Sequence, residues 1–106
     1  MIKFRWFHKK SGKMADWETV LKECDRLSFL LPSEDWAIMQ FTGLFDRNGN
    51  EIYEGDILFN EYKNAVVKFS NRLGAWVGNN GETEYQMLGE GVFQVIGNEY
   101  QNKELL

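Results

Sequence analysis

The stretch Met39–Ile57 reads MQFTGLFDRNGNEIYEGDI and decides the fold of this chain. It begins in an apolar-rich run, Trp36–Thr42, that suits a mostly buried strand. Asn48-Gly49 then predicts a β-hairpin with a two-residue turn, because both residues tolerate positive φ. A second turn is expected at Glu54-Gly55-Asp56, closed by a side-chain cap. The stretch therefore indicates antiparallel β-structure.

The residues that follow continue the β pattern, with short apolar runs separated by glycine and asparagine. Asn79-Asn80-Gly81 predicts a second hairpin turn, and the tail from Asn98 is expected to close with one helical turn. Short strands at this spacing are typical of a small, strongly bent sheet or barrel, which also limits exposed strand edges. The expected strands are Asp56–Tyr62, Ala65–Ser70, Gly74–Val77, Glu84–Leu88 and Val92–Ile96.

The residues before the central stretch predict a strand, a turn and a helix. Ile2–His8 alternates, with Phe4 and Trp6 on the opposite face from Lys3 and Arg5. Ser11-Gly12 indicates a turn. Asp16 can cap a helix that runs to about Leu27 and places Cys24 on its apolar face. The predicted fold class is thus mainly β, with one helix in an N-terminal strand-turn-helix element.

Length and composition indicate one domain over residues 1–106 of an ordinary globular protein. A single cysteine excludes an intramolecular disulfide, which fits a reducing compartment. No apolar run approaches the roughly 20 residues of a membrane span, and lysines interrupt any signal-like apolar run near the start. We therefore expect a cytoplasmic protein of a bacterial host, with no membrane partner.

Charge is unevenly distributed along the chain, although the net value is only −4. Residues 1–13 carry five bases and no acid, so the remainder is strongly acidic. Bases interleaved with aromatic residues can bind single-stranded nucleic acid, but Phe4 and Trp6 are expected to point into the core. The alternative is that this strand contacts the acidic surface of its own chain or of a second subunit. The candidate nucleic-acid or partner-binding residues are Lys3, Arg5, Lys9, Lys10 and Lys13.

The acidic residues offer two further hypotheses. Paired carboxylates at Glu51, Glu54 and Asp56 could serve a hydrolase if their surroundings separated their pKa values. A capped turn with a solvated acidic rim is the favoured explanation, because no histidine, lysine or nucleophile stands near these residues in sequence. Alternatively, acidic residues could form a negative surface that binds a basic host protein. The simpler explanation, which we favour, is that these charges only keep the protein in solution. That candidate surface comprises Glu51, Glu54, Asp56, Glu82, Glu84 and Glu90.

Known cofactor and metal patterns are not met by this sequence. The spacing of Asp46, Asn48 and Asn50 is that of a calcium loop, but Glu51 replaces the glycine and Ile57 the glutamate that the loop requires. His8 is the sole histidine, which excludes a two-histidine metal site within one chain. We therefore predict no cofactor, no metal and no catalytic residue.

Four blocks of the sequence resemble the YopX family of small phage and prophage proteins. The central block carries Gln40-Phe41-Thr42-Gly43-Leu44 and the run from Asn48-Gly49 to Asp56-Ile57. The resemblance implies a β-rich fold with an SH3-like barrel, encoded by a phage or prophage, and it implies no known catalytic residue. The other three blocks are Ile2–Met14, Val66–Phe69 with Gly74–Val77, and Val95–Leu106.

Together these observations predict a non-enzymatic phage accessory protein that acts by protein–protein binding or self-assembly. The expected partner is a host or phage protein, with a homo-oligomer as the second candidate. A nucleic-acid-binding module that uses the basic N-terminal strand is the alternative. A hydrolase that uses Glu51, Glu54 or Asp56 is a weaker one.

Overall fold

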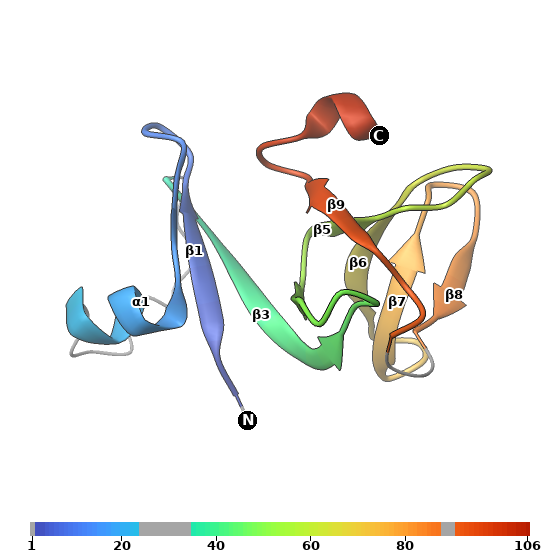
Figure 1. Ribbon diagram of the computed structural model, residues 1–106, viewed down its shortest axis with the longest axis horizontal. Helices are drawn as coiled ribbons and strands as arrows, with labels where there is room; N and C mark the ends of the chain where they lie inside the picture. Colours follow the sequence, from blue (N-terminus) through green and yellow to red (C-terminus); the bar gives the residue numbers. More distant parts are fainter. Residues whose placement is uncertain (1, 24–34, 88–90) are drawn as a thin grey trace. The chain divides into compact units, whose positions relative to one another are not determined.

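A computed structural model describes residues 2–23, 35–87 and 91–106 of the chain, and these residues form a mostly β fold (Figure 1). The described part contains one α-helix and one 3-10 helix. In chain order the elements are β1 (Phe4–His8), β2 (Lys13–Ala15), α1 (Trp17–Glu23), β3 (Trp36–Phe45), β4 (Glu51–Tyr53), β5 (Asp56–Leu58), β6 (Ala65–Ser70), β7 (Ala75–Asn79), β8 (Glu84–Gln86), β9 (Val95–Asn98) and η2 (Lys103–Leu105).

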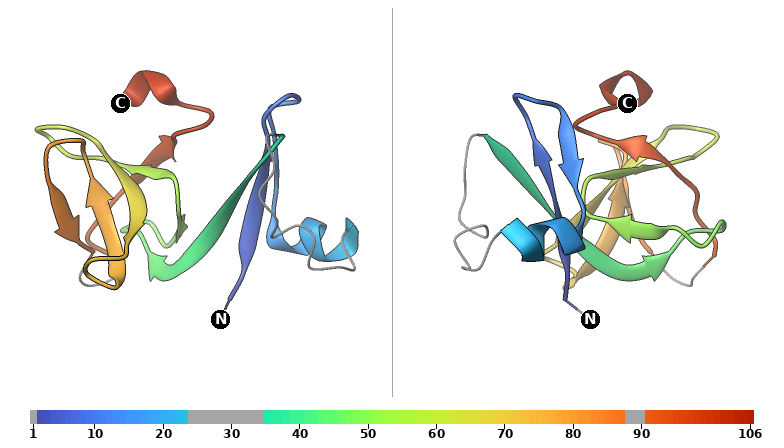
Figure 2. Two further views of the ribbon diagram at one scale, coloured as in Figure 1. Left: turned by 180° about the vertical axis from the view of Figure 1, so that it is seen from behind. Right: turned by 60° about the vertical axis from the view of Figure 1, so that its left-hand side comes forward.

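The strands form two sheets, and the chain divides into two compact units. The four-stranded sheet has the order β2-β1-β3-β4, and the five-stranded sheet has the order β8-β7-β6-β5-β9. The N-terminal unit is Met1–Phe41 and the C-terminal unit is Thr42–Leu106. Figures 1 and 2 show that the five-stranded sheet is strongly curled. The predictions of a mainly β fold and a strongly bent sheet are therefore confirmed.

In the N-terminal unit, β1 pairs antiparallel with β2 on one side and with β3 on the other. His8 lies opposite both Lys13 and Trp36, and Trp6 lies opposite Ala15 and Ile38. Residues directly opposite one another share a sheet face, so these side chains line one face of the sheet. The predicted alternation of β1 is confirmed, since Arg5 and Phe7 belong to the other face.

Helix α1 begins at the predicted cap. The backbone N–H of Thr19 donates to Oδ1 of Asp16 at 2.9 Å, which satisfies one of the free donors of the first turn. Trp17 packs its ring 5.9 Å from that of Phe4, so the helix covers one end of the β1 face. The predicted extension toward Leu27, and Cys24 with it, lies outside the described residues.

The hairpin predicted at Asn48-Gly49 joins β3 to β4, but its turn differs from the expected two-residue form. The backbone N–H of Gly49 donates to the carbonyl of Asp46, and the N–H of Asp46 donates to the carbonyl of Asn50. Gly49 has a φ of +81°, whereas no described residue other than glycine has positive φ. The connection is thus a three-residue loop whose last residue takes the left-handed conformation.

The core of the C-terminal unit collects apolar side chains from several strands. One buried cluster takes a side chain from each of β4, β5 and β6 and adds a methionine that follows β8. Its members are Ile52, Leu58, Val67 and Met87. Partly buried side chains complete the cluster, namely Leu44, Trp76, Phe93 and Val95. Burial of rings and branched aliphatic side chains supplies most of the stabilisation of such a unit.

Two predicted strand boundaries are wrong. The strand expected to reach Tyr62 ends at Leu58, because the side chain of Asn60 accepts the backbone N–H groups of Tyr62 and Lys63 and forms a turn. The strand expected from Val92 begins only at Val95, because the carbonyls of Val92 and Phe93 accept hydrogen bonds from Arg47.

Strand β2 was not predicted, since its three residues show no usable alternation. The other observed strands agree with the predicted ones to within a few residues, and so does the closing helical turn at η2. A strand of three residues is too short to show an alternating pattern. Its position is determined by pairing with β1 across the hairpin.

Gly78 provides a test of packing in the five-stranded sheet. It lies opposite Tyr85, and a Cβ at Gly78 would lie 2.6 Å from Cζ of Tyr85. The Tyr85 ring stacks on Phe93 at 6.0 Å and so has little room to withdraw. We expect Gly78→Ala to lower the free energy of unfolding by about 1–3 kcal/mol. Chemical denaturation measures this value.

A double-mutant cycle supplies the control for that change. In a Tyr85→Ala background the ring is absent, so adding Gly78→Ala is expected to cost less than it does in the native background. Equal costs in both backgrounds would contradict the packing of the Tyr85 ring on Gly78.

Candidate functional site

An aromatic recess lies on the β1 face of the N-terminal unit beside helix α1. The Trp36 ring lies 4.8 Å from that of Trp6 and 4.5 Å from that of His8, measured between centroids. The recess has a volume of about 250 Å³. We call it the aromatic recess, and its lining residues are Trp6, His8, Ser11, Lys13, Met14, Ala15, Thr19 and Trp36.

Each ring of the recess is held by its strand position. Trp6 is buried, whereas Trp36, at the first position of β3, keeps 38% of its surface exposed. The backbone N–H of Ser11 donates to Nδ1 of His8 at 3.2 Å, and the Ser11 hydroxyl lies 2.7 Å from the same atom. A neutral His8 ring that accepts at Nδ1 carries its proton on Nε2. The recess thus offers two aromatic faces and a fixed imidazole.

The basic residues predicted as a binding set are divided by the register of the sheet. Lys13 lies opposite His8 and belongs to the face of the recess, while Lys3 and Arg5 belong to the other face. Lys3 Nζ sits 4.7 Å above the Phe41 ring, a cation–π contact. Among the five, the structure therefore places only Lys13 in the wall of the recess.

Lys9 and Lys10 lie in the turn between β1 and β2, and both are exposed. Lys10 Nζ is 3.4 Å from an oxygen of Asp35, and the Lys9 backbone N–H donates to the carbonyl of the same residue. An exposed ion pair of this kind contributes little to stability. The two contacts nonetheless hold the turn against Asp35, the residue that precedes β3.

Asp46, whose spacing from Asn48 and Asn50 is that of a calcium loop, organises the β3–β4 turn. Its Oδ1 accepts the backbone N–H groups of Asn48 at 2.9 Å and Asn50 at 2.8 Å. Its Oδ2 accepts Nδ2 of Asn50 at 3.4 Å and, from far along the chain, the backbone N–H of Val95 at 3.1 Å. Both carboxylate oxygens are therefore occupied by protein donors.

The same bonds determine the ionisation of Asp46. The side chain is almost fully buried, and burial alone would raise its pKa. The donors from Asn50, Val95 and Asn48 outweigh burial and hold the pKa of Asp46 below its ordinary value. The carboxylate is thus charged at neutral pH and acts as a structural acceptor.

The acidic residues considered as catalytic have structural roles at two of their three positions. Asp56 is 1% exposed, and its Oδ2 accepts the backbone N–H of Tyr53 at 2.7 Å. Glu51 accepts the Tyr53 hydroxyl at 3.1 Å, and Glu54 is half-buried. The predicted side-chain cap of the Glu54-Gly55-Asp56 turn is confirmed, but the expectation that Asp56 joins a solvated rim is wrong.

The other members of the proposed acidic surface have basic neighbours. Glu82 lies 3.8 Å from Lys63 Nζ, and Glu84 lies 3.8 Å from an Arg72 nitrogen. Both carboxylates are well exposed, so each pair is weak. Glu90 lies outside the described residues.

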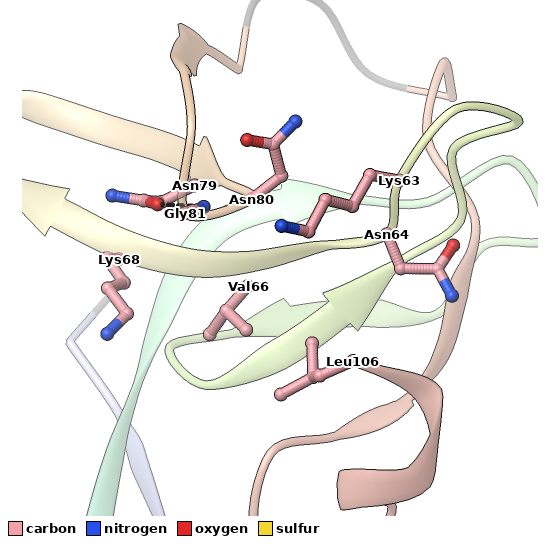
Figure 3. A pocket seen from close by; sticks show the side chains of 8 residues that line it. All are labelled: Lys63, Asn64, Val66, Lys68, Asn79, Asn80, Gly81 and Leu106. Atoms are coloured by element: carbon pink, nitrogen blue, oxygen red, sulfur yellow. Dashed lines mark hydrogen bonds between the residues drawn. The ribbon is translucent and has the colours of Figure 1, made fainter.

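A second pocket, of about 310 Å³, opens in the C-terminal unit (Figure 3). Its walls come from β6, from the end of β7 and the turn after it, and from the loop before β6. We call it the lysine pocket, and its lining residues are Lys63, Asn64, Val66, Lys68, Asn79, Asn80, Gly81 and Leu106.

Both pockets were missed by sequence reasoning. Trp36 was assigned to a mostly buried strand, and nothing in the linear pattern brings it to His8. The pairing of His8 with Trp36 follows from the β1–β3 register alone. The lysine pocket is lined by residues as far apart in sequence as Lys63 and Leu106, so it too arises only from the fold of the unit.

In the ranges that the structure describes, no group of three or more histidine, cysteine or acidic side chains could hold a metal ion. Within the same ranges, no helix is both long and apolar enough to cross a membrane.

Comparison with known proteins identifies a family and solved structures that share the fold. The family model described as YopX protein matches residues 3–106. The crystal structure of protein EF1440 from Enterococcus faecalis has a TM-score of 0.68 and 22% sequence identity. That similarity covers 100% of this chain and 98% of the other, and it shows a shared fold. The comparison with curated proteins found no match.

Asp46→Asn tests the carboxylate that connects the hairpin to β9. The amide has one acceptor oxygen, and its NH₂ group would face a donor, so we expect the free energy of unfolding to fall by about 1–3 kcal/mol at pH 7. Denaturant titration measures the loss. Asp35→Asn, which alters an exposed carboxylate, is the matched control and should change stability by less than about 0.5 kcal/mol.

The pH dependence follows from the lowered pKa of Asp46. A group whose folded pKa is depressed contributes stability above its unfolded pKa of about 3.9 and loses it as pH falls through the folded value. The stability difference between the native chain and Asp46→Asn should therefore narrow below about pH 4. A difference that stays constant down to pH 2 would contradict this role of the carboxylate.

Proposed function

The chain belongs to the YopX family, and we propose that it is a non-enzymatic phage or prophage accessory protein that binds a protein partner through the aromatic recess. The recess is a concave surface with convergent aromatic and polar groups, the usual form of a recognition site. The YopX family has no characterised activity, so the proposal rests on the geometry of this surface.

The observation that carries the proposal is the partial exposure of Trp36 above two other rings. Large apolar side chains at the surface of a protein mark recognition sites when they gather in one place. Tryptophan is also enriched among the residues that dominate binding energy at interfaces. Trp36 has 38% of its surface exposed and lies in the wall of a recess, so it can contact a partner and be covered by it.

The wall of the recess indicates which chemistry a partner would bring. Trp6 and Trp36 favour an apolar or aromatic side chain, which would displace water from their faces. Lys13 stands at the same wall and favours a carboxylate beside that side chain. We infer that the partner presents an apolar residue next to an acidic one.

A nucleic acid is the second candidate ligand, because Trp36 and His8 could stack on a base next to Lys13. The division of the basic residues favours protein over nucleic acid. Lys3 and Arg5 lie on the other face of the sheet from Lys13, so the five bases do not follow one path along a phosphate backbone.

A second copy of the chain is a further possible partner, since the C-terminal unit is acidic. Its sequence from residue 42 onward holds twice as many acids as bases. Light scattering of the purified chain at several protein concentrations measures self-association in the absence of any foreign protein.

Trp36→Ala should abolish capture of the partner from a lysate of the host while leaving the fold intact. Removal of an anchoring tryptophan typically weakens an interface by about 2–4 kcal/mol, or roughly 30-fold to 1,000-fold in affinity. The captured protein is then purified and its binding measured by calorimetry. The matched control is Tyr62→Ala, which removes an 80% exposed ring from the C-terminal unit and should leave binding unchanged.

The outcome that would overturn the proposal is a partner bound equally by the native chain and by Trp36→Ala. Capture of nothing by either protein would also count against it. A partner lost from both variants would indicate a surface outside the recess.

The double change Lys9→Glu and Lys10→Glu separates the two ligand classes. If nucleic acid is the ligand, the change should remove binding to a single-stranded oligonucleotide, and binding by the native chain should weaken steeply with salt. Fluorescence anisotropy measures both effects, with Lys103→Glu as the control in the C-terminal unit. We expect no oligonucleotide binding at physiological salt by the native chain.

A further inference from the structure

We propose that the lysine pocket of the C-terminal unit binds a monocarboxylate with an apolar body. Lys68 pairs with the carboxylate, and the side chains of Val66 and Leu106 contact the apolar body. This inference concerns a different unit from the aromatic recess and does not depend on the function proposed above.

The backbone positions the pocket at the end of two paired strands. Val66 lies opposite Asn79 across β6 and β7, and Lys68 is two residues from Val66, so all three share one sheet face. Figure 3 shows the Val66 side chain between the ammonium ends of Lys63 and Lys68, with Leu106 nearby. A volume of about 310 Å³ suits a small ligand.

Leu106 is held in place by hydrogen bonds of the chain end. Nδ2 of Asn64 donates to the carbonyl of Leu105 at 2.9 Å, and the backbone N–H of Leu106 donates to that of Lys103. The side chain of Leu106 nevertheless remains 57% exposed. An exposed leucine fixed beside the buried Val66 gives the pocket an apolar wall that a ligand can cover.

The charges around the pocket leave one ammonium group without a carboxylate. Lys63 pairs with Glu82 at 3.8 Å, and its Nζ would lie 3.6 Å from a Cβ built on Gly81. Lys68 is exposed, and within the described ranges no ion pair includes it.

Glu84, the other acid beside this turn, has partners of its own. Arg72 lies 3.8 Å from one carboxylate oxygen, and Nδ2 of Asn79 donates to the other at 3.3 Å. Lys68 is therefore the lysine of the pocket wall whose ammonium group forms no ion pair with a carboxylate of the described residues.

A single positive charge selects a singly charged anion. A monocarboxylate matches Lys68, whereas a phosphate dianion would bring a second charge into a unit that has twice as many acids as bases. The pocket also lacks an arginine fork among its lining residues, the group best suited to phosphate. The apolar wall adds a requirement for hydrocarbon on the ligand.

Hexanoate is the probe, and its neutral analogue hexanamide is the matched ligand control. In two-dimensional amide NMR titrations of the full chain, hexanoate should shift the backbone signals of Val66, Lys68 and Gly81. Loss of a charge-assisted hydrogen bond weakens binding by about tenfold or more, so hexanamide should bind at least that much more weakly. Lys68→Met should weaken hexanoate to the same extent.

Lys103→Met is the control variant, since Lys103 is an exposed lysine of the same unit outside the pocket. It should leave hexanoate binding within about twofold of the native value. The amide spectra of both variants report whether the fold is retained, so loss of binding and loss of structure are distinguished.

N-acetylleucine and its amide identify the source of the carboxylate. Tighter binding of N-acetylleucine than of hexanoate would point to the carboxyl end of a peptide, and the reverse order to a free small acid. Either order supports the pocket as a carboxylate site.

The proposal is overturned if hexanamide and hexanoate bind alike, or if Lys68→Met binds hexanoate as the native chain does. Stronger binding of inorganic phosphate than of hexanoate would also overturn it, because the selectivity for a singly charged, apolar anion would then be absent.

Discussion

The buried carboxylate of Asp46 is the interaction on which the C-terminal unit depends. One oxygen closes the turn between β3 and β4, and the other accepts the backbone N–H of Val95 at the start of β9. A single charged group thereby joins residues 49 positions apart in the chain. A buried carboxylate is costly unless its oxygens accept hydrogen bonds, so loss of the bond to Val95 would also destabilise the turn.

The same arrangement explains why the β9 segment starts late. The carbonyls of Val92 and Phe93 accept hydrogen bonds from Arg47 of the turn. Pairing of β9 with β5 therefore begins only at Val95. The turn residues thus compete with the sheet for backbone groups, and the carboxylate decides the boundary. Phe93 remains near the core and stacks with Tyr85, whose ring rests on Gly78.

The two candidate binding surfaces differ in chemistry and in position. The aromatic recess of the N-terminal unit presents rings beside Lys13, while the lysine pocket of the C-terminal unit presents the ammonium group of Lys68 beside Val66 and Leu106. Both surfaces combine a lysine with apolar and neutral polar side chains.

Local sequence by itself determined the element types: the alternation of β1, the cap at Asp16, the two hairpins and the closing helical turn follow from side-chain period and turn chemistry. The sequence of Met39–Ile57, together with the other matching blocks, was also sufficient to identify the family. Tertiary structure alone decided the rest. Whether Asp46 and Asp56 are buried acceptors or surface acids, and whether Trp36 meets His8, depends on strand register and long-range pairing. Register is set by contacts between distant segments, which no local window of the sequence contains.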